Sequence, residues 1–459
     1  RGKIDRDRLR LYDSGSQPAT SAYTAPRDEF EQAVATAFSR VLGVDRVGAR
    51  DDFFALGGHS LLATQVVAAL EEATGVRLDL RTVFMATNVA ALAGTLRTAA
   101  TDSQPMRPIP RCQHYPDGPD SGYLSFGQQR LWFVEQLLPG KATYNMPACV
   151  RLIGAVDRAA FSHSLGQLIE RHEGLRTCFV GDEGQVIQRV VDSAPLALRE
   201  LDLSGADERD RDALDRIIAD EAAEPFDLAR APLLRALLVR VGADEHRLVI
   251  TMHHIISDGW SVGLLIRELA HLYQARVAGR AAALPALPIR YRDYSAWQRS
   301  DCSREGRPEA YAYWSHQLAG APQHLGLPTD RPRPPRPTSA GATYPISLGA
   351  DLSRAVVRFA QRTGTTRFMV LLAGWSALLH HHSGNRDVVV VSPVAGRRRP
   401  ETHGVIGFFV NWLALRTDTG GDPSFRELLE RVRDTCLGGL EYQDVPFEGV
   451  IEQLRLRRE

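Results

Sequence analysis

Residues 252–261 read Met-His-His-Ile-Ile-Ser-Asp-Gly-Trp-Ser, and this stretch connects two different hydrophobic patterns. Before it, the apolar run 247–252 is typical of a half-buried strand. After it, apolar residues recur at helical spacing over 262–269. The turn between them contains Asp258 and Gly259, residue types that favour turns. The stretch therefore predicts a strand-to-helix junction of an α/β fold.

The two histidines of this junction form a candidate active site. A histidine at such a place can lie at the mouth of a cleft, and histidine is the side chain best suited to accept a proton near neutral pH. The alternative for a single histidine is a buried, hydrogen-bonded place in the core. The complete pattern has His253 and His254 followed, after three residues, by Asp258 and Gly259. This pattern is much rarer by chance, so we favour a catalytic interpretation.

Composition restricts the class of protein. The chain has 459 residues, is 44% hydrophobic, and contains 55 basic and 55 acidic residues. This length fits several domains, and the balanced charge gives no reason to expect binding to nucleic acid or to an anionic membrane. No apolar run approaches the roughly 18–20 residues of a membrane span, and the start has no signal-peptide core. Five scattered cysteines without CxxC spacing fit reduced thiols. We therefore expect a cytoplasmic monomer.

The chain divides into two folded parts joined by linkers rich in proline and small polar residues. Segments 13–27 and 101–121 have linker composition. Between them, helical spacing of apolar residues over 28–100 predicts a small helical bundle. From residue 122 strands and helices alternate, which predicts an α/β part. The proline-rich run at 328–337 is too rich in proline for a helix or central strand, so we expect it to cross between two lobes.

Ser60 follows a glycine turn inside the helical part and opens a predicted helix. A simple capping serine is one interpretation. A hydrolase nucleophile is another, but the sequence Gly58-His59-Ser60-Leu61-Leu62 lacks the second glycine of G-x-S-x-G, and no strand precedes it. A third is a modification site, because a phosphate at a helix N-terminus meets unpaired N–H groups and the positive end of the dipole. The third interpretation agrees with the length and helix pattern of this part.

Residues 27–98 resemble the peptidyl carrier (thiolation) domain of nonribosomal peptide synthetases. The resemblance rests on the Asp51-Asp52-Phe53-Phe54 lead-in and on Gly57-Gly58-His59-Ser60. It implies an all-α, four-helix carrier domain over 28–100, with 4′-phosphopantetheine attached to Ser60 by a phosphopantetheinyl transferase. Carriers that precede an epimerase often have Asp before this serine. His59 therefore favours an L-configured donor.

Residues 122–459 resemble the condensation domains of the same enzymes, whose two-lobed fold is that of chloramphenicol acetyltransferase. Six motifs occur in the family's order. They are Leu124–Phe133, Arg171–Phe179, Met252–Ser261, Tyr291–Gln298, Ile406–Asn411 and Gln443–Glu448. The resemblance implies an N-terminal lobe over 122–327, a C-terminal lobe over 328–459, and amide-bond formation from a thioester and an amine.

The resemblance also implies roles for residues of the third motif. His254 matches the catalytic position, where it accepts the amine proton or orients the amine. Asp258 is expected to support the architecture through an ion pair, and the family's arginine of the second motif makes Arg176 the candidate partner. Gly259 is expected to be small so that substrate or backbone can pass closely. Backbone N–H groups near Gly259 are candidate donors to a developing oxyanion.

Other conspicuous residues receive structural interpretations. Adjacent histidines at 380–382 cannot all face one ion on a helix, and they are favourable at a helix C-terminus. His253, His254 and Asp258 have no further ligand at metal spacing, so no metal site is predicted. We expect Trp132 and Phe133 to belong to the core. The run Arg397-Arg398-Arg399 is expected to be a solvated loop that faces a carrier.

Three features depart from the family pattern or lie at the ends. Trp412 follows Asn411 where the family has threonine, and it could narrow a channel or fill the core. The seventh family motif is absent before Glu459, so we expect the sequence to be incomplete at its C-terminus. Residues 1–12 resemble the end of an adenylation domain, whose catalytic lysine matches Lys3. Lys3 is expected to be inert without the rest of that domain.

The expected partners follow from this organisation. They are an upstream adenylation domain, a downstream acceptor carrier, a phosphopantetheinyl transferase, and aminoacyl or peptidyl thioester substrates. Two alternative functions use the same fold: a catalytically silent platform that recruits partner enzymes to the carrier-bound peptide, and an epimerase. Intact His253, His254, Asp258 and Gly259 argue against the platform. The carrier sequence and the fifth motif favour condensation over epimerisation.

Overall fold

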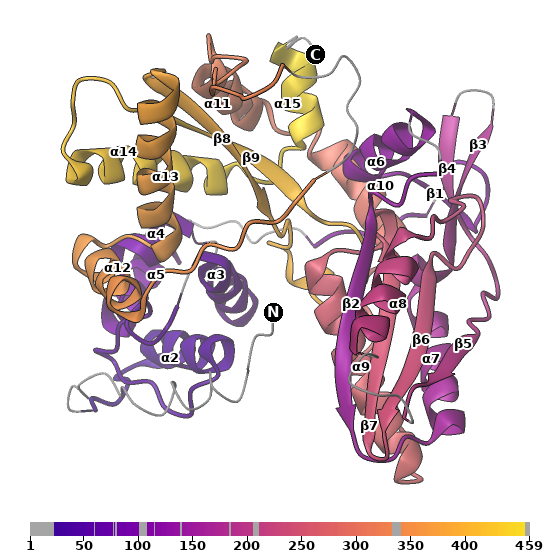
Figure 1. Cartoon of the computed structure of the whole chain (residues 1–459). Coiled ribbons are helices and arrows are strands. Elements are labelled where there is room, and N and C mark those ends of the chain that lie inside the picture. The colour runs from indigo at the N-terminus through magenta and orange to yellow at the C-terminus, as the bar shows by residue number, and fades with distance from the viewer. Residues whose placement is uncertain are drawn as a thin grey trace.

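A computed structural model describes most of the chain as a helical bundle and two α/β lobes (Figure 1). The described residues are 23–58, 60–76, 78, 80–100, 108–113, 115–137, 140–182, 185–204, 211–332 and 341–454. Lys3, the tail at 1–12 and most of the first linker lie outside them. The same holds for residues 333–337 of the proline-rich crossing and for His59. Within the described part of the chain, no helix combines the length and apolarity of a membrane span.

The N-terminal part is the four-helix bundle that the sequence predicts. Its helices are α2 (Glu29–Leu42), α3 (Ser60–Thr74), α4 (Leu80–Met85) and α5 (Val89–Ala99). Asp28 accepts a hydrogen bond from Glu31 N at the start of α2, and Gly43 in the left-handed region ends that helix. Phe38 and Phe53 are fully buried and lie 5.0 Å apart between ring centroids. These caps and aromatic contacts explain why so short a segment folds.

The N-terminal lobe is built on a four-stranded sheet of order β2-β7-β6-β5, in which only the β5–β6 pair is parallel. Alternate residues of β7 pack on opposite faces. Leu248 and Ile250 meet α7 and α9, whereas Val249 joins the cluster that contains α8 residues. The strands are β2 (Asn145–Ile153), β5 (Leu198–Asp202), β6 (Leu234–Gly242) and β7 (Glu245–His253), and the helices are α7 (Arg158–Arg171), α8 (Arg211–Ala223) and α9 (Gly259–Val277).

A second, smaller sheet completes this lobe, with order β1-β4-β3 and antiparallel pairing. Gly122 in β1 packs against Arg292 of α10, so the small sheet and α10 share one contact region. Its elements are β1 (Ser121–Tyr123), β3 (Thr177–Asp182) and β4 (Gln185–Val190), with α6 (Phe126–Leu137), η1 (Glu173–Arg176) and α10 (Tyr291–Asp301) beside them.

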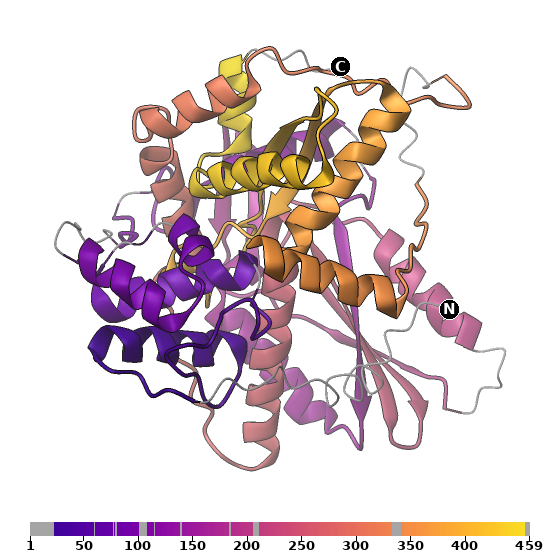
Figure 2. The same cartoon turned by 90° about the vertical axis from the view of Figure 1, so that its left-hand side faces the viewer.

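The C-terminal lobe is centred on the antiparallel pair β8 (Asp387–Val394) and β9 (Asn411–Asp418). Helix α14 packs on β9, where Gly439 lies against Leu413 and Leu415, and α13 packs beside α14. Figure 2 shows α12, α13 and α14 gathered on the side of the lobe that lies beside the bundle. The remaining elements are α11 (Pro308–Leu318), α12 (Ala350–Thr363), α13 (Arg367–Ser383), η4 (Pro400–Thr402), α14 (Phe425–Glu441) and α15 (Phe447–Leu454).

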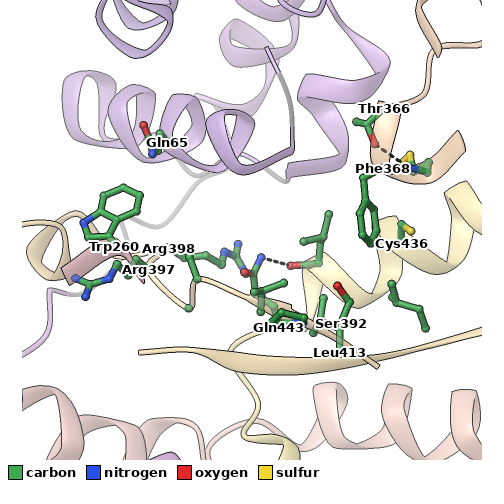
Figure 3. Close-up of a pocket in the computed structure, with 17 residues that line it drawn as sticks. Gln65, Trp260, Thr366, Phe368, Ser392, Arg397, Arg398, Leu413, Cys436 and Gln443 are labelled. Carbon is green, nitrogen blue, oxygen red and sulfur yellow. Dashed lines mark hydrogen bonds between the residues drawn. The ribbon is translucent and has the colours of Figure 1, made fainter. Parts of the chain in front are cut away.

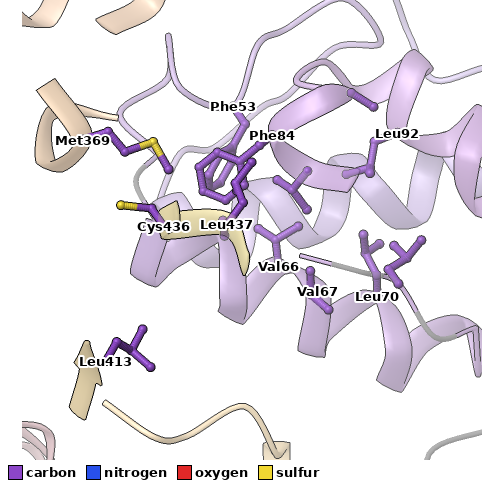
Figure 4. Close-up of a cluster of buried hydrophobic side chains, with 14 of the residues drawn as sticks. Phe53, Val66, Val67, Leu70, Phe84, Leu92, Met369, Leu413, Cys436 and Leu437 are labelled. Carbon is purple, nitrogen blue, oxygen red and sulfur yellow. The ribbon is translucent and has the colours of Figure 1, made fainter. Parts of the chain in front are cut away.

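The bundle docks on the C-terminal lobe through α3 and α4. Helix α4 contacts α14, and α3 contacts η4. Arg433 Nη2 lies 3.0 Å from Met85 Sδ at this contact. The buried side chains of the bundle and of the lobe, among them Phe84, Met369 and Leu437, form one continuous cluster (Figure 4). The two parts are therefore joined by apolar packing rather than by a linker alone.

Candidate active site

The predicted junction lies at the end of a central strand of the larger sheet. Strand β7 ends at His253, a single 3₁₀ turn, η3 (His254–Ile256), follows, and α9 begins at Gly259. Ile255 and Ile256 are buried and fix this turn in the core of the N-terminal lobe. The polar residues of the turn are thereby held at the boundary of the two lobes, where Phe408 and Phe409 of the C-terminal lobe approach.

His254 has one ring nitrogen bonded and the other free. Its Nδ1 lies 2.7 Å from the carbonyl oxygen of Ser257. Because a carbonyl only accepts, Nδ1 carries the hydrogen and Nε2 of the neutral ring keeps its lone pair. The ring is half-buried and meets the edge of Phe408, with 4.9 Å between centroids. No described residue forms a hydrogen bond with Nε2.

His253 has a different place, although it is adjacent. It is only 2% exposed, and its Nδ1 accepts a hydrogen bond from Ile255 N. Its Nε2 therefore carries the hydrogen and donates to Glu135 Oε1 at 3.3 Å. His253 is therefore a buried, hydrogen-bonded histidine of the core, which was the alternative to a catalytic role. Glu135 of α6 lies 118 positions away in the sequence and matches no motif, so no local signal pointed to it.

Asp258 joins the two lobes. It is 1% exposed and caps α9 by accepting from Ser261 N at 2.7 Å. Its carboxylate also accepts from Phe409 N at 3.1 Å and from Arg397 Nη2 at 3.1 and 3.2 Å. Phe409 and Arg397 belong to the C-terminal lobe. The Asp258 carboxylate thus contacts groups of both lobes.

The predicted partner of Asp258 was wrong. Arg176 directs its Nη1 to the carbonyl oxygen of Val191, 2.7 Å away on the N-terminal lobe. Arg397 takes the place beside Asp258 instead. The reason is topological: Arg176 ends the 3₁₀ turn that leads into β3, and the approach of Arg397 depends on lobe packing that spacing does not reveal.

The prediction of a solvated loop at 397–399 was also wrong. Arg397 is 5% exposed and Arg399 9% exposed. Arg397 donates to the carbonyl oxygens of Thr402 and Val405 and to Ser261 Oγ, in addition to Asp258. Burial lowers the pKa of this guanidinium and the Asp258 carboxylate opposes that shift, so it stays charged. A run of arginines therefore need not be solvated: buried carbonyl and carboxylate oxygens can accept hydrogen bonds from the guanidinium groups.

Other predicted residues have mixed outcomes. Phe133 is 48% exposed, so it does not belong to the core as predicted, whereas Trp132 is partly buried and packs against the core of the N-terminal lobe. Trp412 is half-buried beside the guanidinium of Arg130, 5.7 Å from the ring centroid. His380 Nδ1 is hydrogen-bonded to the carbonyl oxygen of Asn385 at the C-terminus of α13. Among the described residues no three potential metal ligands gather.

Gly259 is exposed at the first position of α9. A Cβ built there meets no protein atom within 4 Å, so the space beside it is open. The first amide groups of a helix have no partner inside the helix. At α9, Asp258 accepts from Ser261 N and Val262 N, so only the amides of Gly259 and Trp260 remain as the predicted oxyanion donors.

The start of α3 suits a covalently attached phosphate. Helix α3 begins at Ser60 and continues for 15 residues, so its first amides and its dipole face that position. Gly57 has φ +99°, and a Cβ at Gly58 would collide with Phe53, so the turn before the helix is closely packed. These features fit 4′-phosphopantetheine on Ser60.

A pocket of about 230 Å³ lies between the bundle and the C-terminal lobe (Figure 3). Gln65 of α3 forms one side, and Phe368 and Cys436 form another. Trp260 and Arg397 also line the pocket, and Arg397 forms the ion pair with Asp258. The pocket therefore extends from the helix that starts at Ser60 toward the junction.

Comparison with protein families identifies this arrangement. The family model described as "Condensation domain" matches residues 120–459, and the model described as "Phosphopantetheine attachment site" matches residues 32–96. The chain belongs to the condensation-domain family. The fold that the sequence predicted, a carrier bundle followed by a two-lobed condensation domain, is thereby confirmed. So is the phosphopantetheine carrier, whereas the individual site residues and domain boundaries remain predictions.

Relatives of the condensation domain include long peptide synthetases. The chain is 44% identical over 463 residues to a linear gramicidin synthase polypeptide of Brevibacillus parabrevis, covering all of this chain and 6% of that protein. It is 42% identical over 461 residues to malpinin synthetase of Mortierella alpina, covering 99% of this chain and 6% of that protein. The chain thus spans a small fraction of these relatives.

Solved condensation-type structures resemble the larger part of the chain. The X-domain from teicoplanin biosynthesis has a TM-score of 0.69 and 28% identity, with 77% of each chain covered. The first condensation domain of the calcium-dependent antibiotic synthetase, in complex with a substrate analogue, has a TM-score of 0.63 and 27% identity. That match covers 73% of this chain and 78% of the other.

Proposed function

We propose that this carrier–condensation pair transfers a donor acyl group from a thioester to an acceptor amine, with His254 as the catalytic base. The observation that carries the proposal is the bonding of His254: Nδ1 is held by the Ser257 carbonyl, and Nε2 is free at the lobe boundary. Ser60 would hold 4′-phosphopantetheine, which supplies a flexible arm ending in a thiol for the acyl group.

The reaction requires little activation of the donor, because a thioester is already reactive. Positioning two reactants is therefore a large part of the catalysis. The acceptor nitrogen attacks the thioester carbonyl and forms the C–N bond, while the amine proton passes to His254 Nε2. The C–S bond of the tetrahedral oxyanion then breaks, and the proton returns from His254 to the departing pantetheine sulfur, which leaves as the thiol. The Ser257 carbonyl stabilises the imidazolium through Nδ1–H. Backbone amides beside Gly259 would donate to the developing oxyanion.

The partners follow from the same proposal. An adenylation domain would supply the aminoacyl group, a phosphopantetheinyl transferase would modify Ser60, and a downstream carrier would bring the acceptor amine. We also propose that the protein acts in the cytoplasm. The donor residue would have L configuration, as the His59-Ser60 pair suggests.

Single-turnover transfer tests the proposal. Ser60 is loaded with an aminoacyl-pantetheine, a loaded acceptor carrier is added, and the acceptor is analysed by mass spectrometry. We expect dipeptide on the acceptor with the natural chain and almost none with His254→Ala. Ser60→Ala should carry no arm, and a mass increase on that variant would refute Ser60 as the attachment residue. Equal rates for the natural chain and His254→Ala would refute the base.

A second candidate function is a platform that recruits other enzymes. The observation that favours it is the similarity to the X-domain, which has been solved in a complex with OxyB. Full loading of Ser60 without any transfer to an acceptor would favour this function over condensation.

A further inference from the structure

We propose that the pocket between α3 and the C-terminal lobe holds the side chain of the donor residue and selects uncharged, apolar donors. This inference rests on the proposed function for its physiological meaning. Its physical basis is the wall of the pocket (Figure 3), to which Phe368, Met369, Leu413, Leu415 and Leu440 contribute apolar surface.

The size of the pocket fits a side chain. Its volume is about 230 Å³, and an apolar cavity of roughly 150 Å³ in another protein holds benzene. A branched aliphatic chain or a single aromatic ring therefore has enough room. A charged side chain would lose its hydration there and find few partners. Both guanidiniums of the wall already have acceptors: Arg397 donates to Asp258, and Arg398 is directed to Glu441 O and Asp444.

The location of the pocket favours binding of the donor side chain over binding of the acceptor side chain. Gln65, on the wall, belongs to α3, the helix that begins at Ser60. Trp260 and Arg397, at another part of the wall, adjoin Gly259 and Asp258. The wall thus combines a residue of the helix that begins at Ser60 with residues next to the junction, and we assign the pocket to the donor on this ground.

The thiol in the wall does not conflict with a thioester substrate. Cys436 is 2% exposed, and burial raises its pKa to about 12. Because only the thiolate attacks a thioester, this thiol stays unreactive near neutral pH. The pocket can thus hold an activated acyl group without diverting it.

Calorimetric binding of two unreactive probes tests the pocket directly. The probes are leucyl- and aspartyl-aminopantetheine, in which an amide replaces the thioester, so Ser60 and catalysis are not involved. We expect the natural chain to bind the leucyl probe at least about tenfold more tightly. Leu440→Phe, which fills the pocket, should reduce that preference below about threefold. Leu371→Phe on α13, at a residue that is 50% exposed and outside the pocket, should leave it unchanged.

A second pair of variants keeps the test valid if Leu440→Phe fails to fold. Phe368 lies at the rim and is 43% exposed, so Phe368→Ala should weaken the leucyl probe about fivefold through lost contact. Phe425→Ala, at a residue that is 42% exposed and outside the pocket, is the matched control. Equal binding of both probes to the natural chain, or an unaltered preference in both pocket variants, would overturn the inference.

Transfer assays separate this inference from the proposed function. Alanyl and leucyl donors are loaded on Ser60 of the natural chain and of Leu440→Phe. Slower leucyl transfer with unchanged alanyl transfer in the variant supports both proposals. Selective probe binding without transfer of either donor supports the pocket and contradicts condensation, whereas equal transfer of both donors by both proteins contradicts the pocket alone.

Discussion

At the scale of single residues, the adjacent histidines 253 and 254 differ in the hydrogen-bond partners of their ring nitrogens. His253 uses both nitrogens within the protein, toward Ile255 N and Glu135. His254 uses only Nδ1. The hydrogen bonds thus distinguish the two histidines: both ring nitrogens of His253 bond protein atoms, whereas only one nitrogen of His254 does so among the described residues.

Replacing His254 by alanine should reduce transfer by about 10²–10⁴-fold, the usual contribution of a general base. The fold should persist, because the ring is only half-buried and Nε2 supports no protein contact. Single-turnover rates and thermal melting measure the two effects. His381→Ala, which removes an exposed histidine of α13, is the control and should retain the natural rate. A large fall in melting temperature for His254→Ala would instead indicate a structural role.

Replacing Asp258 by alanine should destabilise the protein by about 3–5 kcal/mol, because it leaves the buried guanidinium of Arg397 without its counter-ion. Urea denaturation measures the change. Arg151→Ala removes a half-exposed partner of Glu245 and should cost at most about 1 kcal/mol.

The double variant of Asp258 and Arg397 provides the decisive comparison. Asp258→Ala combined with Arg397→Met should be more stable than Asp258→Ala alone, since no buried charge remains unpaired. Additive losses in this cycle would contradict the ion pair as the link between the lobes.

At the scale of elements, α3 and α4 of the bundle contact η4 and α14 of the C-terminal lobe. The junction of β7 and α9 belongs to the other lobe, and Asp258 connects it to the loop before η4. The elements that carry Ser60 and His254 are therefore linked through the C-terminal lobe.

Charge substitution at the α4–α14 contact should weaken docking of the bundle. Met85→Lys places a cation beside Arg433, whose Nη2 lies 3.0 Å from Met85 Sδ. We expect a larger radius of gyration in small-angle X-ray scattering and slower transfer from Ser60. Adding Arg433→Glu should restore both, because the new pair attracts.

The matched control for that experiment is Ile153→Lys, at a residue of β2 that is 78% exposed on the N-terminal lobe. It adds the same charge away from the docking contact and should change neither quantity. If Met85→Lys also leaves the radius of gyration unchanged, the docked arrangement does not depend on this contact.

At the scale of the whole molecule, acid should destabilise the N-terminal lobe through Glu268. Burial raises the pKa of this carboxyl, but hydrogen bonds and charges of His172 and Arg171 outweigh burial, so the pKa lies below its ordinary value. A depressed carboxyl pKa contributes stability that is present above the ordinary value of 4.5 and is lost as pH falls through the folded value.

Melting temperatures between pH 3 and pH 7 measure this dependence. Glu268→Gln should have a lower melting temperature at pH 7 and a shallower fall in acid than the natural chain. Parallel curves for the two proteins would show that Glu268 does not contribute to the acid dependence.

The sequence by itself determined the family and the order of the parts, and it made residues 252–261 the candidate for the reactive segment. Helical and strand periodicities are local properties, and the HHxxxDG and Gly-Gly-His-Ser motifs lie within short stretches. The N-cap role of Asp258 is also local, since a cap depends on neighbours within one turn, although only an ion pair was predicted for this residue.

Only the tertiary structure decided which distant groups complete the site. Arg397 pairs with Asp258 across 139 positions and Glu135 meets His253 across 118, distances at which spacing carries no information. Tertiary packing also buries Arg397 and leaves Phe133 exposed, contrary to what their residue types suggest. The pocket beside Cys436 likewise exists because helices from two separate domains pack together. Local chemistry is encoded in short segments, whereas charge pairing, burial and cavities arise where the lobes and the bundle meet.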